Sequence, residues 1–220
     1  IYIVIFLYHK DAGASRLNLE GEEYHYLFKV RRERSGAIIS LRNLKDDLLY
    51  SYEIEEVGKK DAALSLIDSV SKPVTPKKEL HIAWAIVDVK NIEKTLPFLN
   101  EIGVGRITFF YASRSQKNFK INIERLERII ISSCEQCGRS DRLKIDIKNS
   151  TKELLEGLGE FLVLDFCDKK LGEISSCDTY VIGPEGGFCD KERAMFGDKM
   201  RAFDSDFVFR SESAVAALAS

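Results

Sequence analysis

The sequence predicts an α/β protein with two domains, a small β-rich domain followed by a larger one built on a mostly parallel sheet. Several short apolar and β-branched runs fill the first seventy residues. Residues 72–78 then hold two of the four prolines and three lysines, which is typical of a stiff linker. From residue 79 onward, apolar runs alternate with helical patterns, as in a parallel sheet covered on both faces.

The N-terminal domain is expected to span residues 1–71 and to form a small barrel. Strands are expected at 1–8, 37–42, 48–57 and 62–70, split by glycines and charged turns. Residues 22–30 are expected to form one short helix. Several short strands in so few residues favour a barrel over an open sheet.

The second domain, residues 79–220, is expected to begin with a buried strand at 80–87. A helical pattern from Val89 to Ile102 follows and ends at Gly103. Pro97 lies inside this pattern, so we expect a kink or an irregular turn there. Further strands are expected at 106–111, 143–147, 161–165 and 179–182, and further helices at 121–137, 151–158, 191–197 and 211–220.

The charge balance excludes a disordered chain and argues against a protein that coats nucleic acid through bulk charge. The 220 residues include 33 Lys and Arg against 35 Asp and Glu, and 45% are hydrophobic. The charge is nevertheless uneven, because six basic residues lie within residues 29–45 beside Tyr24, Tyr26 and Phe28. This segment is a candidate RNA-facing surface, although an ordinary solvated helix face would have the same composition.

The five cysteines do not form a disulfide framework, because their number is odd and all lie in the second half of the chain. Cys134 and Cys137 form one C-x-x-C without a second pair at zinc spacing, so we expect no metal site. Both thiols fall on the buried stripe of the helix expected at 121–137.

The longest apolar run, residues 1–8, is too short to span a bilayer. We therefore expect a cytoplasmic protein with no membrane partner.

The motif with the clearest chemical meaning is residues 182–188 (IGPEGGF), where a buried strand enters a glycine-rich turn before a helix. Ligands of parallel sheets bind beyond the carboxyl ends of strands, and glycine lets the backbone approach them closely. The turn is neither a Walker loop nor a dinucleotide fingerprint. A tight structural turn is the alternative interpretation.

Two further motifs contain arginine. In residues 133–139 (SCEQCGR), Gly138 suits the end of a helix, and Arg139 and Arg142 are expected to project from the loop that follows. A guanidinium there would grip phosphate, or would simply be solvated. In residues 209–214 (FRSESA), Ser211 is expected to be a helix N-cap with Glu212 near the positive helix end, which needs no catalytic role.

Together these motifs resemble the 16S ribosomal RNA (uridine-N3)-methyltransferase family, in the knotted (SPOUT) superfamily of S-adenosylmethionine-dependent RNA methyltransferases. The resemblance covers essentially the whole chain. Residues 135–139 (EQCGR) and 182–188 (IGPEGGF) match outright, and residues 25–36, 90–104 and 209–214 are similar. The loop at 204–210 reads DSDFVFR where the family has Leu-Gly-x-Arg-Ile-Leu-Arg.

The resemblance implies a PUA-like RNA-binding β-barrel domain at 1–71, a linker at 72–78 and an α/β trefoil-knot methyltransferase domain at 79–220. It also implies a homodimer and a bent S-adenosyl-L-methionine held by three loops. The corresponding cofactor-binding residues are Leu164, Asp165, Ile182, Gly183, Pro184, Gly186, Gly187, Phe203, Val208 and Phe209.

The implied reaction is methylation of N3 of a uridine in 16S rRNA, within the assembled small ribosomal subunit. Glu185 or Glu212 would accept the N3 proton, and Arg210 or Arg139 would stabilise charge on the adjacent carbonyl oxygens. The candidate RNA-binding residues are Lys29, Arg31, Arg32, Arg34, Arg42, Arg114 and Arg142. The alternatives are methylation of another RNA such as tRNA, and a non-catalytic RNA-binding ribosome-assembly factor.

Overall fold

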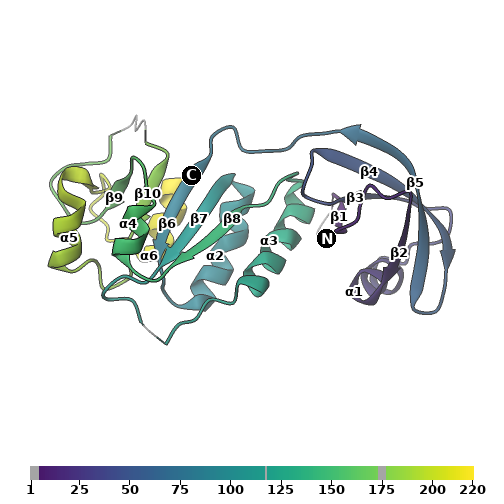
Figure 1. The fold of residues 1–220 in the computed structure, drawn as a ribbon, viewed down its shortest axis with the longest axis horizontal. Coiled ribbons are helices and arrows are strands. Elements are labelled where there is room, and N and C mark those ends of the chain that lie inside the picture. Colours follow the sequence, from purple (N-terminus) through teal and green to yellow (C-terminus); the bar gives the residue numbers. More distant parts are fainter. Residues whose placement is uncertain (1–4, 117, 173–176) are drawn as a thin grey trace. The chain divides into compact units, whose positions relative to one another are not determined.

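The computed structural model describes residues 5–116, 118–172 and 177–220, and the chain forms two compact units (Figure 1). The first comprises Ile1–Thr75 together with Ile131–Arg142, and the second comprises Pro76–Ile130 together with Leu143–Ser220. The division after Thr75 falls inside the expected linker at 72–78. The return of residues 131–142 to the first unit was not predicted, because helical periodicity shows that a face is buried but not against which partner.

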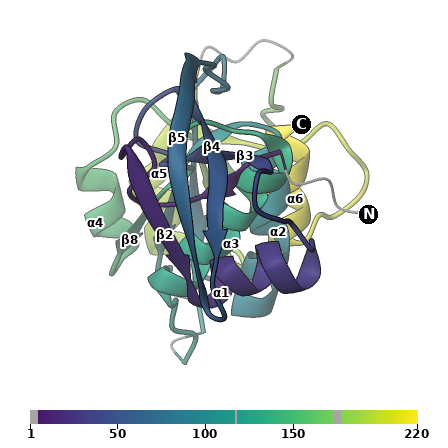
Figure 2. The ribbon, with the colours of Figure 1, turned by 90° about the vertical axis from the view of Figure 1, so that its right-hand side faces the viewer.

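The first unit contains a five-stranded sheet in the order β1-β3-β4-β5-β2 (Figure 2). Its strands are β1 (Leu7–Tyr8), β2 (Arg16–Glu20), β3 (Ile38–Arg42), β4 (Leu48–Val57) and β5 (Asp61–Ser71). All pairings are antiparallel except that of β1 with β3. Of the strand predicted at residues 1–8, residues 1–4 lie outside the described part of the chain. Strand β2 was missed, although its alternation of exposed and buried residues is that of a half-buried strand.

Alternating apolar residues on these strands build the core of the first unit. Tyr52, Ile54 and Leu64 are fully buried, and Tyr24 and Leu27 pack against them from the segment that was predicted as one helix. That segment is a short α-helix, α1 (Gly21–Tyr24), which continues as a π-helix, η1 (His25–Val30). The wider turn of η1 is a local feature that residue periodicity does not report.

The second unit contains a six-stranded sheet in the order β11-β9-β10-β6-β7-β8, and all its pairings are parallel. The predicted parallel sheet is therefore confirmed. Its strands are β6 (Leu80–Ala85), β7 (Val104–Phe110), β8 (Lys144–Lys148), β9 (Leu162–Leu164), β10 (Thr179–Ile182) and β11 (Met200–Arg201). The helices are α2 (Val89–Glu101), α3 (Ile123–Cys137, divided between the units), α4 (Thr151–Glu156), α5 (Asp190–Phe196), the 3₁₀ turn η2 (Gly197–Lys199) and α6 (Ser211–Ala219).

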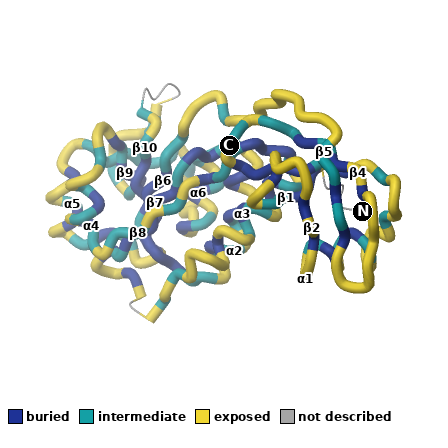
Figure 3. Tube along the Cα trace, turned by 45° about the vertical axis from the view of Figure 1, so that its right-hand side comes forward, coloured by how far each residue is buried: buried dark blue, intermediate teal, exposed yellow. Residues whose placement is uncertain are grey.

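The central strands of this sheet are the most deeply buried part of the second unit. Strands β6 and β7 are mostly dark in Figure 3 because four of the six residues of β6 and six of the seven residues of β7 are buried. Small residues such as Ala83 and Ala85 leave room for an aromatic cluster in which Phe188 meets Phe196 edge to face, with centroids 4.7 Å apart. Helix α2 continues through Pro97 as one element, so no break occurs where a kink or irregular turn was expected.

Candidate functional site

Three neighbouring parallel strands, β11, β9 and β10, end at the same edge of the sheet. The loops that follow them begin at residues 202, 165 and 183. Together these loops line a cavity of about 580 Å³. This size lies within the range of small-molecule sites, and its position is where ligands of open parallel sheets bind.

The glycine-rich turn after β10 supplies one wall of this cavity. Gly187 has a φ of +65°, in the left-handed region that favours glycine, and its N–H donates to the Pro184 carbonyl at 2.8 Å. At Gly183, a Cβ would lie 3.0 Å from the ring of the buried Phe188. A side chain at either position would therefore strain the turn or displace the aromatic cluster beneath it.

Ser211 fastens the start of α6 to the same turn. Its hydroxyl donates to the Gly183 carbonyl at 2.6 Å and accepts the indole N–H of Trp84 at 2.8 Å. Trp84 is fully buried on β6. The prediction of Ser211 as an N-cap is wrong, because it is the first residue inside α6 and its hydroxyl bonds the glycine turn instead.

An ion pair connects the loop after β9 with α5. The Arg193 guanidinium donates to both carboxylate oxygens of Asp165, at 2.7 and 3.2 Å. Hydrogen bonding to Asp165 is the main cause that raises the pKa of Arg193. Since the side chain of Asp165 is only 3% exposed and is neutralised by Arg193, it shapes the cavity wall rather than acting as a base.

The cavity lining combines an apolar floor with charges of both signs. Leu164, Ile182 and Ala202 contribute apolar surface. The acidic residues on the lining are Asp165, Asp168 and Glu185, and the basic ones are Lys170, Arg201 and Arg210. Such a lining suits a ligand that is partly apolar and carries both a cation and a carboxylate.

Comparisons with known proteins identify the family. Residues 74–220 match the family described as RNA methyltransferase domain, and residues 19–67 match the one described as RNA methyltransferase PUA domain. The chain belongs to the RNA methyltransferase domain family. It is 42% identical, over 98% of its length and 97% of the relative's, to the "Ribosomal RNA small subunit methyltransferase E" of Helicobacter pylori strain 26695.

Solved structures show the same fold. A protein of Legionella pneumophila in complex with bound S-adenosylmethionine has a TM-score of 0.84 at 24% identity, with 99% of this chain and 96% of that chain covered. A ribosomal RNA small subunit methyltransferase E from Neisseria gonorrhoeae, bound to S-adenosylmethionine, has a TM-score of 0.82 at 21% identity, with 97% and 94% covered. The predicted fold class, an α/β trefoil-knot methyltransferase domain preceded by a small PUA-like domain, is confirmed.

The methyltransferase domain brings most of the predicted cofactor-binding residues together. All of them except Gly186 line the cavity. The carbonyl of Gly186 accepts a hydrogen bond from the Arg114 guanidinium at 2.8 Å. Phe166, which ends the first of the three loops that the resemblance implied, also lines the cavity, whereas the prediction missed Lys170, Arg201 and Ala202. Strand β11, only two residues long, was missed too, although the motif resemblance had marked the loop that follows it through Phe203, Val208 and Phe209.

The predicted catalytic residues do not all meet at the cavity. Arg210 and Glu185 are exposed on its lining. Glu212 is absent from the lining: its Oε1 accepts from the Asn91 side chain of α2 at 3.4 Å, and its Oε2 is buried without a hydrogen bond from any described residue. Arg139 lies in the other compact unit.

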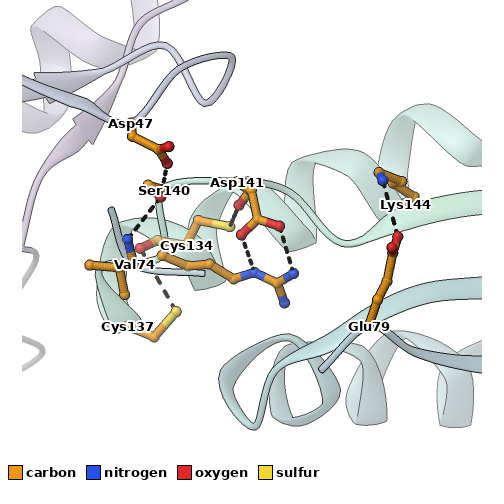
Figure 4. Close-up of polar contacts among 9 residues, drawn as sticks. Asp47, Val74, Glu79, Cys134, Cys137, Ser140, Asp141 and Lys144 are labelled. Atoms are coloured by element: carbon orange, nitrogen blue, oxygen red, sulfur yellow. Dashed lines mark hydrogen bonds and ion pairs between the residues drawn. The ribbon is translucent and has the colours of Figure 1, made fainter. Parts of the chain in front are cut away.

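Arg139 does not project into solvent as expected. Its side chain is 4% exposed, and its guanidinium donates to both oxygens of Asp141, at 2.7 and 3.0 Å. The adjacent Ser140 exchanges backbone and side-chain hydrogen bonds with Val74 and donates its hydroxyl to Asp47 at 2.8 Å (Figure 4). Ser140, directly after the EQCGR motif, therefore links the chain that follows α3 to residue 74 and to the loop before β4.

The predicted RNA-binding residues divide into exposed and buried ones. Lys29, Arg31, Arg32 and Arg34 are exposed at the end of η1 and in the loop after it. Arg114 is exposed in the methyltransferase domain, and Arg142 is half-buried in the first unit.

Arg42 is not part of an RNA-binding surface, contrary to the prediction, because it is only 2% exposed. Its guanidinium donates to the Lys72 carbonyl at 2.8 Å and lies over the Phe6 ring, and burial lowers its pKa. The Arg42 side chain is therefore hydrogen-bonded to the backbone that follows β5 and is not available to bind phosphate.

The described residues hold neither a metal-binding cluster nor a membrane-spanning helix. Residues 5–116, 118–172 and 177–220 contain no group of three or more His, Cys, Asp or Glu side chains that could hold a metal ion. Within the same ranges, no helix has the length and apolar character needed to cross a membrane. At the C-x-x-C, Cys134 is buried and its thiol donates to the Asp141 carbonyl at 3.4 Å.

Proposed function

We propose that this protein methylates N3 of a uridine in the 16S rRNA of the small ribosomal subunit, with S-adenosyl-L-methionine as methyl donor. The cavity at the carboxyl ends of β9, β10 and β11 carries the proposal, because its three loops include nearly all the residues expected to hold that donor. The similarity to small-subunit rRNA methyltransferases along almost the whole chain supports the same substrate class.

The residues of the cavity fit such a donor. Leu164, Ile182 and Phe203 offer apolar surface to an adenine ring, and the backbone of the 183–187 turn approaches the ligand without side chains at Gly183 and Gly187. Asp168 would pair with the ammonium of the amino-acid part, and Lys170 or Arg201 with its carboxylate. When bound, S-adenosylmethionine supplies a methyl group activated by a sulfonium.

Glu185 and Arg210 are the residues proposed to act on the base. Uridine N3 carries a proton and is a poor nucleophile until that proton leaves, so the Glu185 carboxylate would accept it. The Arg210 guanidinium would stabilise the charge that then develops on the flanking carbonyl oxygens. Glu212 and Arg139 are left out of this scheme, because the first is absent from the lining and the second is buried against Asp141 in the first unit.

The first unit would dock the RNA through its exposed basic residues. Lys29, Arg31, Arg32 and Arg34 follow one another closely at the end of η1, and contacts with phosphate would orient the substrate without reading its sequence. Arg114 and Arg142 would add contacts. The motif resemblance further supports a homodimer in the cytoplasm, and sedimentation velocity that finds a monomer would contradict the dimer.

Labelled methyl transfer tests the proposal. Purified protein and labelled donor are incubated separately with small subunits from a strain lacking the enzyme, with free 16S rRNA and with tRNA. We expect incorporation into the small subunits. Incorporation into tRNA alone would favour the alternative RNA substrate. A protein that binds no S-adenosylmethionine in calorimetry would instead be a non-catalytic assembly factor.

A further inference from the structure

The rim of the cavity carries two phenylalanine side chains that are largely exposed. Phe207 is 82% exposed and Phe166 is 72% exposed, whereas every other phenylalanine among the described residues is at most 39% exposed. Both line the same cavity, together with the 75%-exposed Val208. Single exposed apolar residues are common, but such a cluster around one ligand cavity indicates a contact with something outside the described chain.

In the loop between β11 and α6, Phe207 is exposed, whereas the rings of Phe203 and Phe209 pack against each other. Phe203 and Phe209 meet edge to face, with centroids 5.0 Å apart and planes at 66°. The N–H of Phe207 donates to the Ser205 hydroxyl at 3.1 Å, which fixes the backbone at the base of the ring. The neighbouring rings therefore stabilise the loop, and the ring of Phe207 is left accessible.

We propose that Phe207 is the stacking surface for the target uracil. This inference rests on the proposed function, because a base must leave its stack to reach a methyl donor inside the cavity. Proteins hold unstacked bases on aromatic side chains, whose flat faces suit any base. Arg210 is exposed on the same lining three residues later, so a base stacked on Phe207 would have its carbonyl oxygens near a guanidinium.

The position of Phe207 favours the base over the cofactor as its partner. The cofactor would lie among the three loops, against the half-buried or buried Leu164, Ile182 and Phe203. Because Phe207 is 82% exposed as a residue, most of its surface is open to a substrate that arrives from solvent. Phe207 is accordingly a positioning residue, which sets the base in line with the methyl group.

Three substitutions test whether Phe207 acts through its flat aromatic ring or only through its apolar character. Phe207→Ala removes the side chain, Phe207→Leu keeps an apolar group without a flat face, and Phe207→Tyr keeps the ring. We expect kcat/KM for small subunits to fall about 5- to 150-fold in the Ala and Leu variants, the range that corresponds to about 1–3 kcal/mol per stacked base. The Tyr variant should stay within about twofold of the unchanged protein. Calorimetry should give the same Kd for S-adenosylmethionine in all three.

Two results would overturn the inference. Full kcat/KM in Phe207→Leu would show that the aromatic face is not needed. A lower mass of Phe207→Ala in light scattering would instead show that the ring covers a contact between copies of the chain.

Failure of the proposed methyltransferase function can be distinguished from failure of the stacking inference. If the unchanged protein methylates no small-subunit RNA, filter-retention binding of that RNA still decides the inference, with weaker binding expected for Ala and Leu than for Tyr. Equal RNA affinity of the three variants would contradict stacking on Phe207.

Discussion

At the scale of single residues, Glu185 and Arg210 carry the proposed chemistry because both are exposed on the lining of one cavity. Their neighbours in that wall have structural tasks. Asp165 is neutralised by Arg193, and Ser211 bridges Trp84 and Gly183. The sequence motifs identified candidate acidic and arginine side chains but did not separate chemical roles from structural ones. A motif gives only residue types, whereas burial and hydrogen-bond partners decide what each side chain does.

Glu185→Gln should abolish most of the methyl transfer while it leaves cofactor binding intact. A positioned general base contributes about 10²- to 10⁴-fold, and glutamine keeps the size of the side chain without accepting the N3 proton. Single-turnover rates and calorimetry with S-adenosylmethionine measure the two effects. Glu212→Gln, which changes a carboxylate outside the cavity lining, is the matched control and should retain the rate of transfer. An unchanged rate in Glu185→Gln would remove this residue from the scheme.

Ser211→Ala should destabilise the methyltransferase domain and weaken cofactor binding. The substitution leaves the Trp84 indole N–H and the Gly183 carbonyl without their shared partner, at a cost of about 1–3 kcal/mol. Denaturant unfolding measures the loss. Ser220→Ala, at the exposed end of the same helix, is the control and should stay within about 0.5 kcal/mol. Equal stability of the two variants would contradict the bridging role.

At the scale of secondary-structure elements, strands bounded by clear turns were predicted well, and strands that depend on distant pairing were not. Strands β4 and β10 have the predicted limits, because their apolar runs end at charged or glycine-rich turns. Strands β2 and β11 were missed, because they pair with strands far away in the sequence and β11 has only two residues. The same limit explains the end of α3, whose burial was predicted but whose partner was not.

Glu135, near the end of α3, should make the stability of the first unit depend on pH. Burial, with a smaller contribution from Glu23, raises its pKa from 4.5 to about 7, while its carboxylate accepts the N–H of Tyr8 at 2.8 Å. The folded state binds the proton more tightly than the unfolded state does. The contribution of Glu135 to the free energy of unfolding is therefore fully present below about pH 4.5, and it is lost as the pH rises through about 7.

Glu135→Gln tests this linkage, because glutamine keeps an acceptor for Tyr8 and cannot ionise. We expect thermal unfolding to show similar stability of the two proteins at pH 5 and a more stable variant at pH 8. A difference between the proteins that stays constant from pH 5 to pH 8 would contradict the raised pKa.

At the scale of the whole molecule, a net charge of −2 conceals how the charge is arranged. Most of the basic residues predicted to face RNA are exposed, but Arg42 is buried inside the first unit. Composition indicated a basic segment, whereas only the structure shows which of its side chains are exposed. The local field near these exposed groups, rather than the total charge, governs an encounter with phosphate.

Replacing Lys29, Arg31, Arg32 and Arg34 by alanine should weaken RNA binding and flatten its dependence on salt. Each lost phosphate contact lowers the slope of log K against log salt by about 0.7 to 0.9. Filter-retention binding over a series of salt concentrations measures the slope. Lys94→Ala with Lys152→Ala, exposed on α2 and α4 of the methyltransferase domain, is the control. Identical slopes for the two variants would place the RNA on another surface.

Nucleoside mass spectrometry tests the central claim most directly. Small subunits from a strain lacking the enzyme are incubated with the protein and S-adenosylmethionine, and their RNA is digested to nucleosides and mapped. The proposed function predicts N3-methyluridine at one position of the 16S rRNA, and none with Glu185→Gln. A methyl group on another base, or no new methylated nucleoside although the protein binds the cofactor, would contradict it.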